Sequence, residues 1–579
     1  MRCIQGCKYL WKLPLYNSAE QSEMMSLAAS CSLAHSFVEI LYNRGFRTRE
    51  DIMRYIFISR DQVHDPRLLK DGERAVERIQ KAIANGEKIL IAGDYDVDGI
   101  TATSLMLYSL KLIGAQVNFF LPVRSRDGYG LSVAVVEKAK KNNYSLIITV
   151  DNGVTAFDAI AHAHANGIDV IVTDHHQMQG TVSGAYAIVN PAQSDCAYPF
   201  KHLAGVGVSF KLMQLLYTTL GKELPAKVYE LLMLGTVADV VPLVGENRFW
   251  VREGLAHVRS NPSFALDVLL RNVNFDKPTI TSSDVGFIIA PQINALGRLD
   301  DPRSGVSFLI GTQSEDIANT GKILGELNEK RKKIERDIIA QVHEQIQQHV
   351  IAIADRYIVI AYAENWPAGV VGLAASRIVS CYGRPTILLH KTADGFLKGS
   401  ARSIPECNIF EALQAHSDIL CSFGGHAHAA GLSLRFDDVE EFESRINQYL
   451  KERLTPADLV PKLSLDAQVL LQDVGASLFD TLCYGEPYGA QNPEPLFLLQ
   501  NVMLIEPPKL LKDVHVRCRV SGIDGSVRSI MFFSRPDIYT FLAGLSTGEL
   551  FNCAVTIREH YFRATRTIEL YGMDVSRSL

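Results

Sequence analysis

Acidic residues and two histidines follow three apolar runs of the sequence directly. The runs span 88–92, 146–150 and 170–173, and the polar residues behind them are Asp94, Asp96 and Asp98, then Asp151, then His175 and His176. Carboxylates this close together raise each other's pKa and destabilise a fold unless a cation lies between them. Carboxylates with imidazoles suit Mg²⁺ or Mn²⁺. Because they exceed what one ion needs, we expect two ions, which together can activate water and hold the oxygens of an in-line displacement at phosphorus.

The apolar runs must place these residues together. They alternate with helical patterns, which is typical of a mostly parallel sheet with helices on both faces. The carboxyl ends of parallel strands lie at one edge of such a sheet, where ligands bind. Asp239 ends the apolar helical run 231–238 and, if buried, needs a partner. Taken singly, residues 94–98 could equally be an acidic loop or a helix N-terminus instead of part of a metal site, and residues 151–153 could be a turn. Their occurrence at successive strand ends favours a metal site.

Length and composition indicate a multidomain globular protein. The chain has 579 residues, 47% hydrophobic and 21% charged, and a net charge of −6 with a pI near 6.3. This charge neither indicates nor excludes nucleic-acid binding, because a local basic groove can lie on an acidic protein. The cysteines are scattered without a C-x-x-C pair, which argues against zinc modules and a disulfide framework. We expect a cytoplasmic protein with no signal peptide and no membrane span.

The pattern of elements divides the chain into five parts and predicts the α/β fold class. We expect a helical N-terminal lead-in at 1–71, a first α/β unit at 72–312, a connecting helix at 313–350, a second α/β unit at 351–455 and a small β-barrel at 460–579. The barrel is expected to be of the oligonucleotide-binding (OB) type, with Arg517, Arg519, Arg528, Phe532 and Phe533 as candidates for contact with a single strand, although alternation along a strand buries some of them.

Several motifs resemble those of the DHH phosphoesterase superfamily. They include Gly93-Asp94-Tyr95-Asp96-Val97-Asp98-Gly99, Thr173-Asp174-His175-His176 and Gly424-Gly425-His426-Ala427-His428-Ala429-Ala430-Gly431. Their order along nearly the whole chain is similar to that of the superfamily's bacterial single-strand-specific exonucleases. The resemblance implies that the first unit is a DHH catalytic domain, the second a DHH-associated domain and the last an OB-like nucleic-acid-binding domain.

The resemblance also implies roles for individual residues. The metal ligands would be Asp96, Asp98, Asp151, His175 and Asp239. Catalytic roles would fall to His176 and Arg298, which would stabilise charge at the phosphate, and to Asp94, beside the ligands or an occasional ligand itself. A 5′-phosphate pocket would contain Arg124, Ser400, Arg402 and His426. Arginine suits that pocket because its planar fork can pair with two phosphate oxygens at once.

The expected activity is removal of nucleoside 5′-monophosphates from the 5′ end of single-stranded DNA by two-metal-ion hydrolysis, in DNA repair and recombination. The resemblance implies a helicase and a single-strand-binding protein as partners, and nothing in the sequence indicates an obligate oligomer. One alternative is a DHH-type phosphodiesterase of short oligonucleotides or cyclic dinucleotides, which the extra segment 463–579 disfavours. Another is a non-catalytic single-strand-binding scaffold, which the intact ligand positions disfavour.

Overall fold

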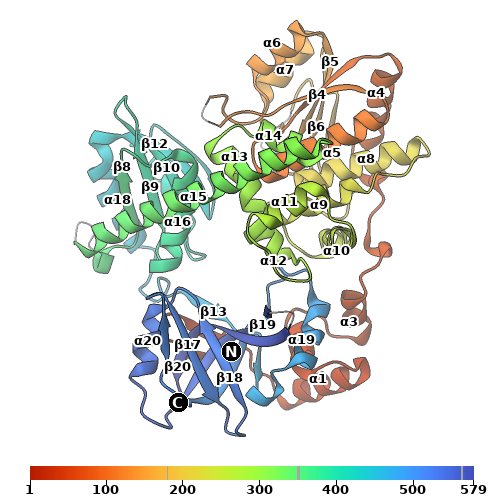
Figure 1. Ribbon diagram of the computed structural model, residues 1–579. Coiled ribbons are helices and arrows are strands. Elements are labelled where there is room, and N and C mark those ends of the chain that lie inside the picture. The colour runs from red at the N-terminus through yellow and green to blue at the C-terminus, as the bar shows by residue number, and fades with distance from the viewer. Residues whose placement is uncertain (125, 179, 181, 349–352, 563–564, 579) are drawn as a thin grey trace.

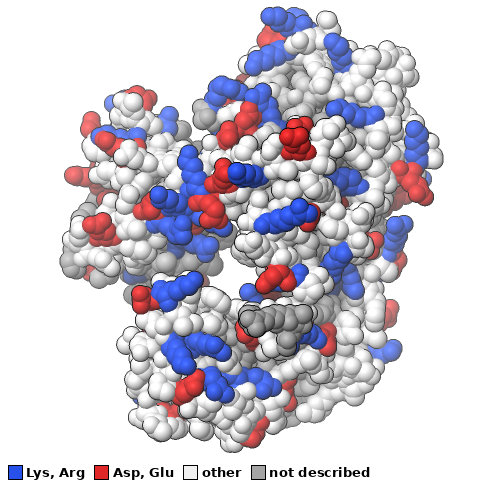
Figure 2. Space-filling model, in the orientation of Figure 1, with Lys and Arg blue, Asp and Glu red and all other residues white. Residues whose placement is uncertain are grey.

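The computed structural model describes residues 1–124, 126–178, 180, 182–348, 353–562 and 565–578. Two α/β units and a C-terminal β unit are arranged around a central gap (Figure 1). In the space-filling view this gap is an opening, and Lys and Arg side chains gather beside it over the helices of the second unit (Figure 2). Among the described residues no single helix is long and apolar enough to cross a membrane; α1 (Ser18–Cys31) and α2 (His35–Asn43) pass that test only as a pair bent by 117°.

The first unit contains a parallel sheet with the order β4-β3-β5-β6-β7. Its strands are β3 (Lys88–Ala92), β4 (Gln116–Phe120), β5 (Tyr144–Val150), β6 (Asp169–Thr173) and β7 (Ala187–Val189). The central strands read as continuous apolar runs because helices cover both faces of the sheet. One face packs against α6 (Val133–Lys141) and α7 (Phe157–Ala165). The other packs against α4 (Gly72–Ala84), α5 (Val97–Leu112) and α8 (Gly205–Thr219). The predicted alternation of strands and helices is confirmed.

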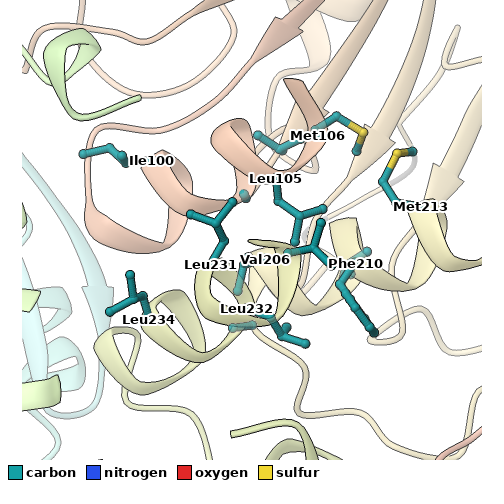
Figure 3. Packing of buried hydrophobic residues seen from close by; sticks show 14 of the residues in the cluster. Ile100, Leu105, Met106, Val206, Phe210, Met213, Leu231, Leu232 and Leu234 are labelled. Atoms are coloured by element: carbon teal, nitrogen blue, oxygen red, sulfur yellow. The ribbon is translucent and has the colours of Figure 1, made fainter. Parts of the chain in front are cut away.

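The helices that carry site residues are fixed by a fully buried core. Leu105 of α5, Val206 of α8 and Leu231 of α9 (Lys227–Ala238) point toward one another and have no exposed surface (Figure 3). The α5 helix is buried on all sides, as expected of a helix in the core of a large unit. This packing holds the N-termini of α5 and α8 and the C-terminus of α9 at the carboxyl edge of the sheet.

Helices continue from the first unit to the second. They are α10 (Gly245–Ser260), α11 (Phe264–Arg271), α12 (Ser282–Asp284), the π-helical turn Val285–Ile289, α13 (Ala290–Leu299), α14 (Arg303–Ile310) and the 34-residue α15 (Ser314–Gln347). The α15 helix confirms the expected long connecting helix. Residues 349–352, on which the predicted boundary with the second unit falls, lie outside the described residues, as does residue 579; the predicted domain boundaries therefore stay predictions.

The second unit has a sheet with the order β11-β12-β10-β9-β8, in which only β8 and β9 run parallel. Its strands are β8 (Val359–Ala363), β9 (Thr386–Lys391), β10 (Phe396–Arg402), β11 (Ser422–His426) and β12 (Ala429–Arg435). Helix α16 (Ala368–Tyr382) packs against one face, while α17 (Ile409–Gln414) and α18 (Val439–Lys451) pack against the other.

The C-terminal unit has a sheet with the order β14-β15-β19-β20-β18-β17-β16. Its strands are β14 (Ala467–Val469), β15 (Phe497–Leu504), β16 (Lys509–Leu511), β17 (His515–Ser521), β18 (Val527–Phe532), β19 (Leu550–Phe562) and β20 (Thr565–Arg577). Because β15 also pairs with β17, the pairings form a closed circuit of five strands. This circuit is compatible with the small barrel expected from the sequence.

The N-terminal lead-in is not entirely helical, so the prediction for 1–71 was incomplete. Besides α1, α2 and α3 (Arg49–Ile56) it contains β1 (Arg2–Gln5) and β2 (Leu10–Leu13), which form a sheet with β13 (Lys462–Ser464). The strands β1 and β2 are only four residues long, and their register depends on a partner about 450 positions away. Local patterning could not have revealed them.

One buried carboxylate attaches this N-terminal hairpin to the C-terminal unit. Asp574 of β20 accepts hydrogen bonds from Trp11 Nε1 at 2.9 Å, from the Tyr9 amide at 3.1 Å and from Arg535 at 3.0 Å. Its side chain has no exposed surface, so each of these donors depends on it.

We predict that Asp574→Ala releases the hairpin, because three donors lose a buried partner. The local free energy of opening should fall by about 3 kcal/mol. Amide hydrogen exchange of residues 2–13, followed by mass spectrometry, should then accelerate roughly a hundredfold. Asp524→Ala, an exposed aspartate between β17 and β18, is the control and should leave this exchange unchanged. Unchanged protection in Asp574→Ala would contradict the assignment.

Candidate metal centre and phosphate pocket

The predicted metal-site residues meet at the carboxyl edge of the first sheet. Potential ligand atoms lie within 4.8 Å of one another in three overlapping groups, which are Asp94 with Asp96 and Asp151, Asp98 with His175 and Asp239, and Asp151 with His175 and His176. Asp94, Asp96 and Asp98 follow β3 and open α5, Asp151 follows β5, the histidines follow β6, and Asp239 ends α9. The structure therefore brings all seven of these residues together.

Asp151 lies at the centre of this cluster. His175 Nε2 is 3.2 Å from Asp151 Oδ1 and 3.7 Å from Asp239 Oδ2. The backbone of Asp151 has a φ of 62°, in the left-handed region that non-glycine residues rarely adopt. Gly205 at the start of α8 lies directly against the Asp151 side chain, since a Cβ there would come within 2.5 Å of Oδ1. The close approach of α8 thus requires glycine.

Two carboxylate oxygens of the cluster are buried without a partner. Oδ1 of Asp94 and Oδ1 of Asp151 accept no hydrogen bond from any described residue, and both side chains are almost fully buried. A buried charge without a partner is costly, so such oxygens fit a bound cation. The oxygen-rich donor set with one imidazole fits the predicted Mn²⁺ or Mg²⁺.

Hydrogen bonding distinguishes the carboxylates from one another. Asp98 Oδ2 and Oδ1 accept the amide protons of Gly205 at 2.6 Å and Val206 at 2.8 Å, at the N-terminus of α8. Asp96 Oδ1 accepts from Gly99 at 2.9 Å and caps α5. These oxygens keep further lone pairs for a metal, but they are already oriented by backbone. Asp94, which the resemblance placed beside the ligands or among them as an occasional ligand, has an oxygen without a hydrogen-bond partner among the described residues.

The electrostatics of the cluster favour cation binding. Burial, followed by repulsion from the neighbouring carboxylates, raises the pKa of Asp94, Asp151 and Asp239 well above the usual range and that of Asp98 to about 7. Burial and the adjacent His176 lower the pKa of His175 to about 4, so its imidazole is neutral and can ligate a metal. The metal-free cluster therefore retains protons that a divalent cation would replace.

Asp174 positions His176, a role that the sequence did not assign. Asp174 Oδ1 lies 2.7 Å from His176 Nδ1, and Oδ2 accepts the Val154 amide at 3.0 Å. Burial lowers the pKa of His176, but the hydrogen bond and charge of Asp174 outweigh it and leave that pKa raised. Burial likewise raises the pKa of Asp174, yet His176 leaves it lowered. The contact with Asp174 thus orients His176 beside the cluster and favours its protonated form, and the adjacent position of Asp174 was the available signal.

Arg298 connects the metal cluster to the second unit. It lies in the last turn of α13, and its Nη1 donates to the carbonyl of Gly369 in α16 at 2.8 Å. A Cβ on Gly369 would approach the Arg298 carbonyl to 2.4 Å, so the two helices touch here. Burial, followed by repulsion from Arg124, lowers the pKa of Arg298 to about 10, which still leaves it charged at neutral pH.

A cavity of about 580 Å³ between the two α/β units contains most of the predicted phosphate-binding residues. Arg124 of the first unit and Ser400 and Arg402 of β10 line it, and Arg402 Nη1 donates to Ser400 Oγ at 2.8 Å. His426 is exposed and is not among the lining residues, but it shares a face of β11 with Ser422 and Gly424, which do line the cavity. Lys398 and His390, which the sequence missed, do line it. Lys398 was detectable, because 398, 400 and 402 share one face of a strand.

The residues of the C-terminal unit that were predicted to contact a single strand differ in their exposure. Phe532 is completely buried in the core, and Arg528 donates to the Val474 carbonyl at 2.7 Å, so neither is available to a strand. Phe533 is 50% exposed and stacks on Tyr571 with ring centroids 5.2 Å apart. Arg517 is exposed, whereas Arg519 lies 3.8 Å from Glu506. Alternation at the end of β18 separates Phe532 from Phe533, whereas Arg517 and Arg519 share one exposed face of β17 and differ in the contact with Glu506.

The fold and the site together define a metal-dependent phosphoesterase. Family models match three segments of the chain, namely the DHH family, N-terminal domain at 88–236, the DHHA1 domain at 355–452 and the RecJ OB domain at 465–574. The single-stranded-DNA-specific exonuclease RecJ of Dickeya dadantii is 35% identical over 91% of this chain and 93% of its own length. The chain belongs to the RecJ family of single-stranded-DNA-specific exonucleases, and the predicted resemblance is confirmed.

Other relatives agree with this assignment. RecJ of Bacillus subtilis is 36% identical over 89% of this chain, which spans 65% of that relative's length. The crystal structure of RecJ in complex with Mn²⁺ from Thermus thermophilus superposes with a TM-score of 0.81 and 27% identity, covering 98% of this chain and 80% of that one. A second crystal structure of exonuclease RecJ bound to manganese has a TM-score of 0.59 and 31% identity over 67% of this chain and 96% of that one.

We predict that the metal-free protein loses stability as the pH rises from 5 to 8. The pKa of Asp98 is 3.8 in the unfolded chain and about 7 in the fold, so the folded state binds more protons between these values. The free energy of unfolding therefore falls as the pH rises through this window. Mn²⁺ replaces the protons and should raise the melting temperature more at pH 8 than at pH 5.

Differential scanning fluorimetry with Mn²⁺ or EDTA measures this effect. Asp98→Asn should flatten the pH dependence of the metal-free protein and reduce the shift caused by Mn²⁺. Asp158→Asn, an exposed aspartate of α7, should change neither. The assignment is wrong if Mn²⁺ leaves the melting temperature at pH 8 unchanged.

Proposed function

We propose that this protein is a 5′-to-3′ exonuclease that releases nucleoside 5′-monophosphates from single-stranded DNA and acts in DNA repair and recombination. The observation that carries the proposal is the pairing of two sites. A carboxylate cluster with unpartnered oxygens lies on one α/β unit, and a cavity lined by arginine and lysine lies between this unit and the next. The first suits divalent cations and the second suits a terminal phosphate.

The aspartates and His175 are the residues we propose to hold two Mn²⁺ or Mg²⁺ ions. The full set is Asp94, Asp96, Asp98, Asp151, His175 and Asp239. When bound, the ions would supply an activated water and neutralise charge on the phosphate oxygens. His176, oriented by Asp174, would donate a hydrogen bond to the scissile phosphate, and Arg298 would stabilise the same charge from the side of α16.

The cavity would determine which end of a strand is attacked. Arg124 and Arg402 can grip a terminal 5′-phosphate from two units, with Ser400 as a further donor. A phosphate held there would place the neighbouring phosphodiester at the metal centre. Preference for a single strand would follow from the contact between α13 and α16, since Arg298 and Gly369 leave the two units touching beside the site.

The cellular setting is also a proposal. We infer that the protein acts in the cytoplasm as a monomer, on strands that a helicase exposes and a single-strand-binding protein covers; support for this comes from the family resemblance alone. The convergence of all predicted ligands at one edge argues against a non-catalytic scaffold. The described C-terminal unit, which a shorter oligonucleotide phosphodiesterase would not need, favours long single strands as substrate.

We predict that Asp151→Ala and His175→Ala abolish cleavage, because each removes a central ligand. Each should lower kcat by at least about a thousandfold. With Mn²⁺ or Mg²⁺, strands labelled at the 3′ end should shorten stepwise over time, and strands labelled at the 5′-phosphate should release the label as a mononucleotide. Both results are expected only with the unsubstituted protein and the Asp158→Asn control. Binding of the strand without cleavage by the unsubstituted protein would instead support a scaffold.

We predict that Arg402→Ala reduces the advantage of a 5′-phosphorylated strand over a 5′-hydroxyl strand. Loss of a bidentate charge-assisted contact should lower kcat/KM for the phosphorylated strand by roughly 10- to 100-fold and leave the hydroxyl strand nearly unaffected. Arg435→Ala on the neighbouring strand β12 is the control, because Arg435 is exposed and does not line the cavity. An equal loss on both strands would refute a role in end recognition.

A further inference from the structure

The cavity between the two α/β units is larger and more basic than a single phosphate requires. Three permanent cations, Arg124, Lys398 and Arg402, line its volume of about 580 Å³, and none of the described residues that line it is Asp or Glu. A phosphate monoester carries a charge of only about −1.5 to −2 at neutral pH. One terminal phosphate would therefore leave positive charge and space unused.

Along β10 the polar lining residues form two groups, Arg402 with Ser400 and then Lys398, which we call the two ends of the cavity. Arg402 and Ser400 lie near the N-terminus of α16, where Ala368 and Val371 also line the wall. Lys398 lies two residues back along β10, roughly 7 Å from Ser400. Lys398, at the second end, is therefore a separate contact beside the predicted 5′-phosphate site.

This second end is a row of polar side chains across four strands. His390 of β9 is the direct partner of Lys398, Ser433 of β12 is its partner on the other side, and Ser422 of β11 pairs with Ser433. The two serine hydroxyls are 2.6 Å apart, and all four side chains line the cavity. His390 Nδ1 is buried and has no hydrogen-bond partner among the described residues, so the imidazole lines the cavity but does not present this nitrogen to it.

The floor between the two ends is bare backbone. Gly431 faces Ser400 on one side and Gly424 on the other. A Cβ built on Gly424 would meet nothing within 4 Å, and one on Gly431 would meet only a carbonyl at 3.8 Å. These glycines are not required for packing within the sheet, and their effect is to keep the space between the basic ends open.

We propose that this cavity binds a 5′-terminal di- or triphosphate rather than only a monophosphate. The phosphate next to the sugar would bind Arg124, Ser400 and Arg402, and the outer phosphates would bind Lys398 and His390. The proposal rests on the proposed function and extends it to the chemistry of the strand end. The same phosphate chain can be carried by a strand with a 5′-triphosphate or by a free nucleoside triphosphate, which would then compete with the strand.

Equilibrium binding tests the proposal without cleavage. Fluorescence anisotropy in EDTA compares 3′-labelled single strands of one sequence that end in a 5′-hydroxyl, a 5′-monophosphate or a 5′-triphosphate. We expect the triphosphate strand to bind roughly tenfold more tightly than the monophosphate strand, since each charge-assisted contact contributes about that factor. Lys398→Ala should remove this difference and keep the preference for monophosphate over hydroxyl.

Lys391→Ala is the matched control. Lys391 neighbours His390 on β9, lies 3.3 Å from Glu364 and does not line the cavity, so its loss should leave the order of affinities unchanged. A triphosphate strand that binds no better than a monophosphate strand overturns the proposal, as does an equal loss for all three ends in Lys398→Ala. Loss of the monophosphate preference in the unsubstituted protein would instead refute end recognition itself.

Competition separates the two sources of the phosphate chain. Inorganic tripolyphosphate and a nucleoside triphosphate are each added to the bound 5′-monophosphate strand. Displacement that Lys398→Ala weakens about tenfold supports binding of free polyphosphates in the cavity. If neither competitor displaces the strand while the triphosphate strand keeps its advantage, the cavity recognises the phosphate chain only on a strand end.

Discussion

The main constraint on this structure is the electrostatic repulsion between carboxylates that are buried close together. Asp94, Asp98 and Asp151 are each less than 5% exposed, and separate segments of the chain bring them together. Burial and mutual repulsion raise their pKa values, so the site is unfavourable without cations. Other interactions must therefore offset this free-energy cost. The apolar packing of α5, α8 and α9 behind the sheet edge contributes stability and holds the carboxylates in place.

The sequence reveals the residues of this site because the fold places strand ends at one edge. Three apolar runs each followed by ligand-type residues suffice to predict the cluster, and Asp239 could be added from its position after an apolar helix. Position in the sequence could not show which carboxylate oxygens are already hydrogen-bonded and which are left without a partner. Backbone donors at the N-terminus of α8 take up both oxygens of Asp98, whereas Asp94 keeps one free. Only the tertiary placement of a helix from 107 residues further along the chain decides this.

The second unit was harder to predict for a different reason. Ser400 and Arg402, which its motifs indicated, line the cavity, and His426 lies exposed on the same strand face as two residues that line it, Ser422 and Gly424. Lys398 and His390 come together through strand pairing between β9 and β10, which no local pattern announces. The N-terminal strands were missed likewise, because β2 pairs with β13 from a distant part of the chain. Interactions between distant segments, rather than residue type, limited the prediction.

The metal cluster and the basic cavity each contain like charges that repel one another, negative in the cluster and positive in the cavity. Burial and repulsion from Arg124 lower the pKa of Arg402, which shows that the guanidinium groups of the cavity destabilise one another as the carboxylates do. An anion at the cavity relieves the second repulsion just as cations at the cluster relieve the first. In the function proposed above, a strand without a terminal phosphate would not relieve this repulsion, so discrimination between strand ends would draw on a repulsion that is already present in the free protein.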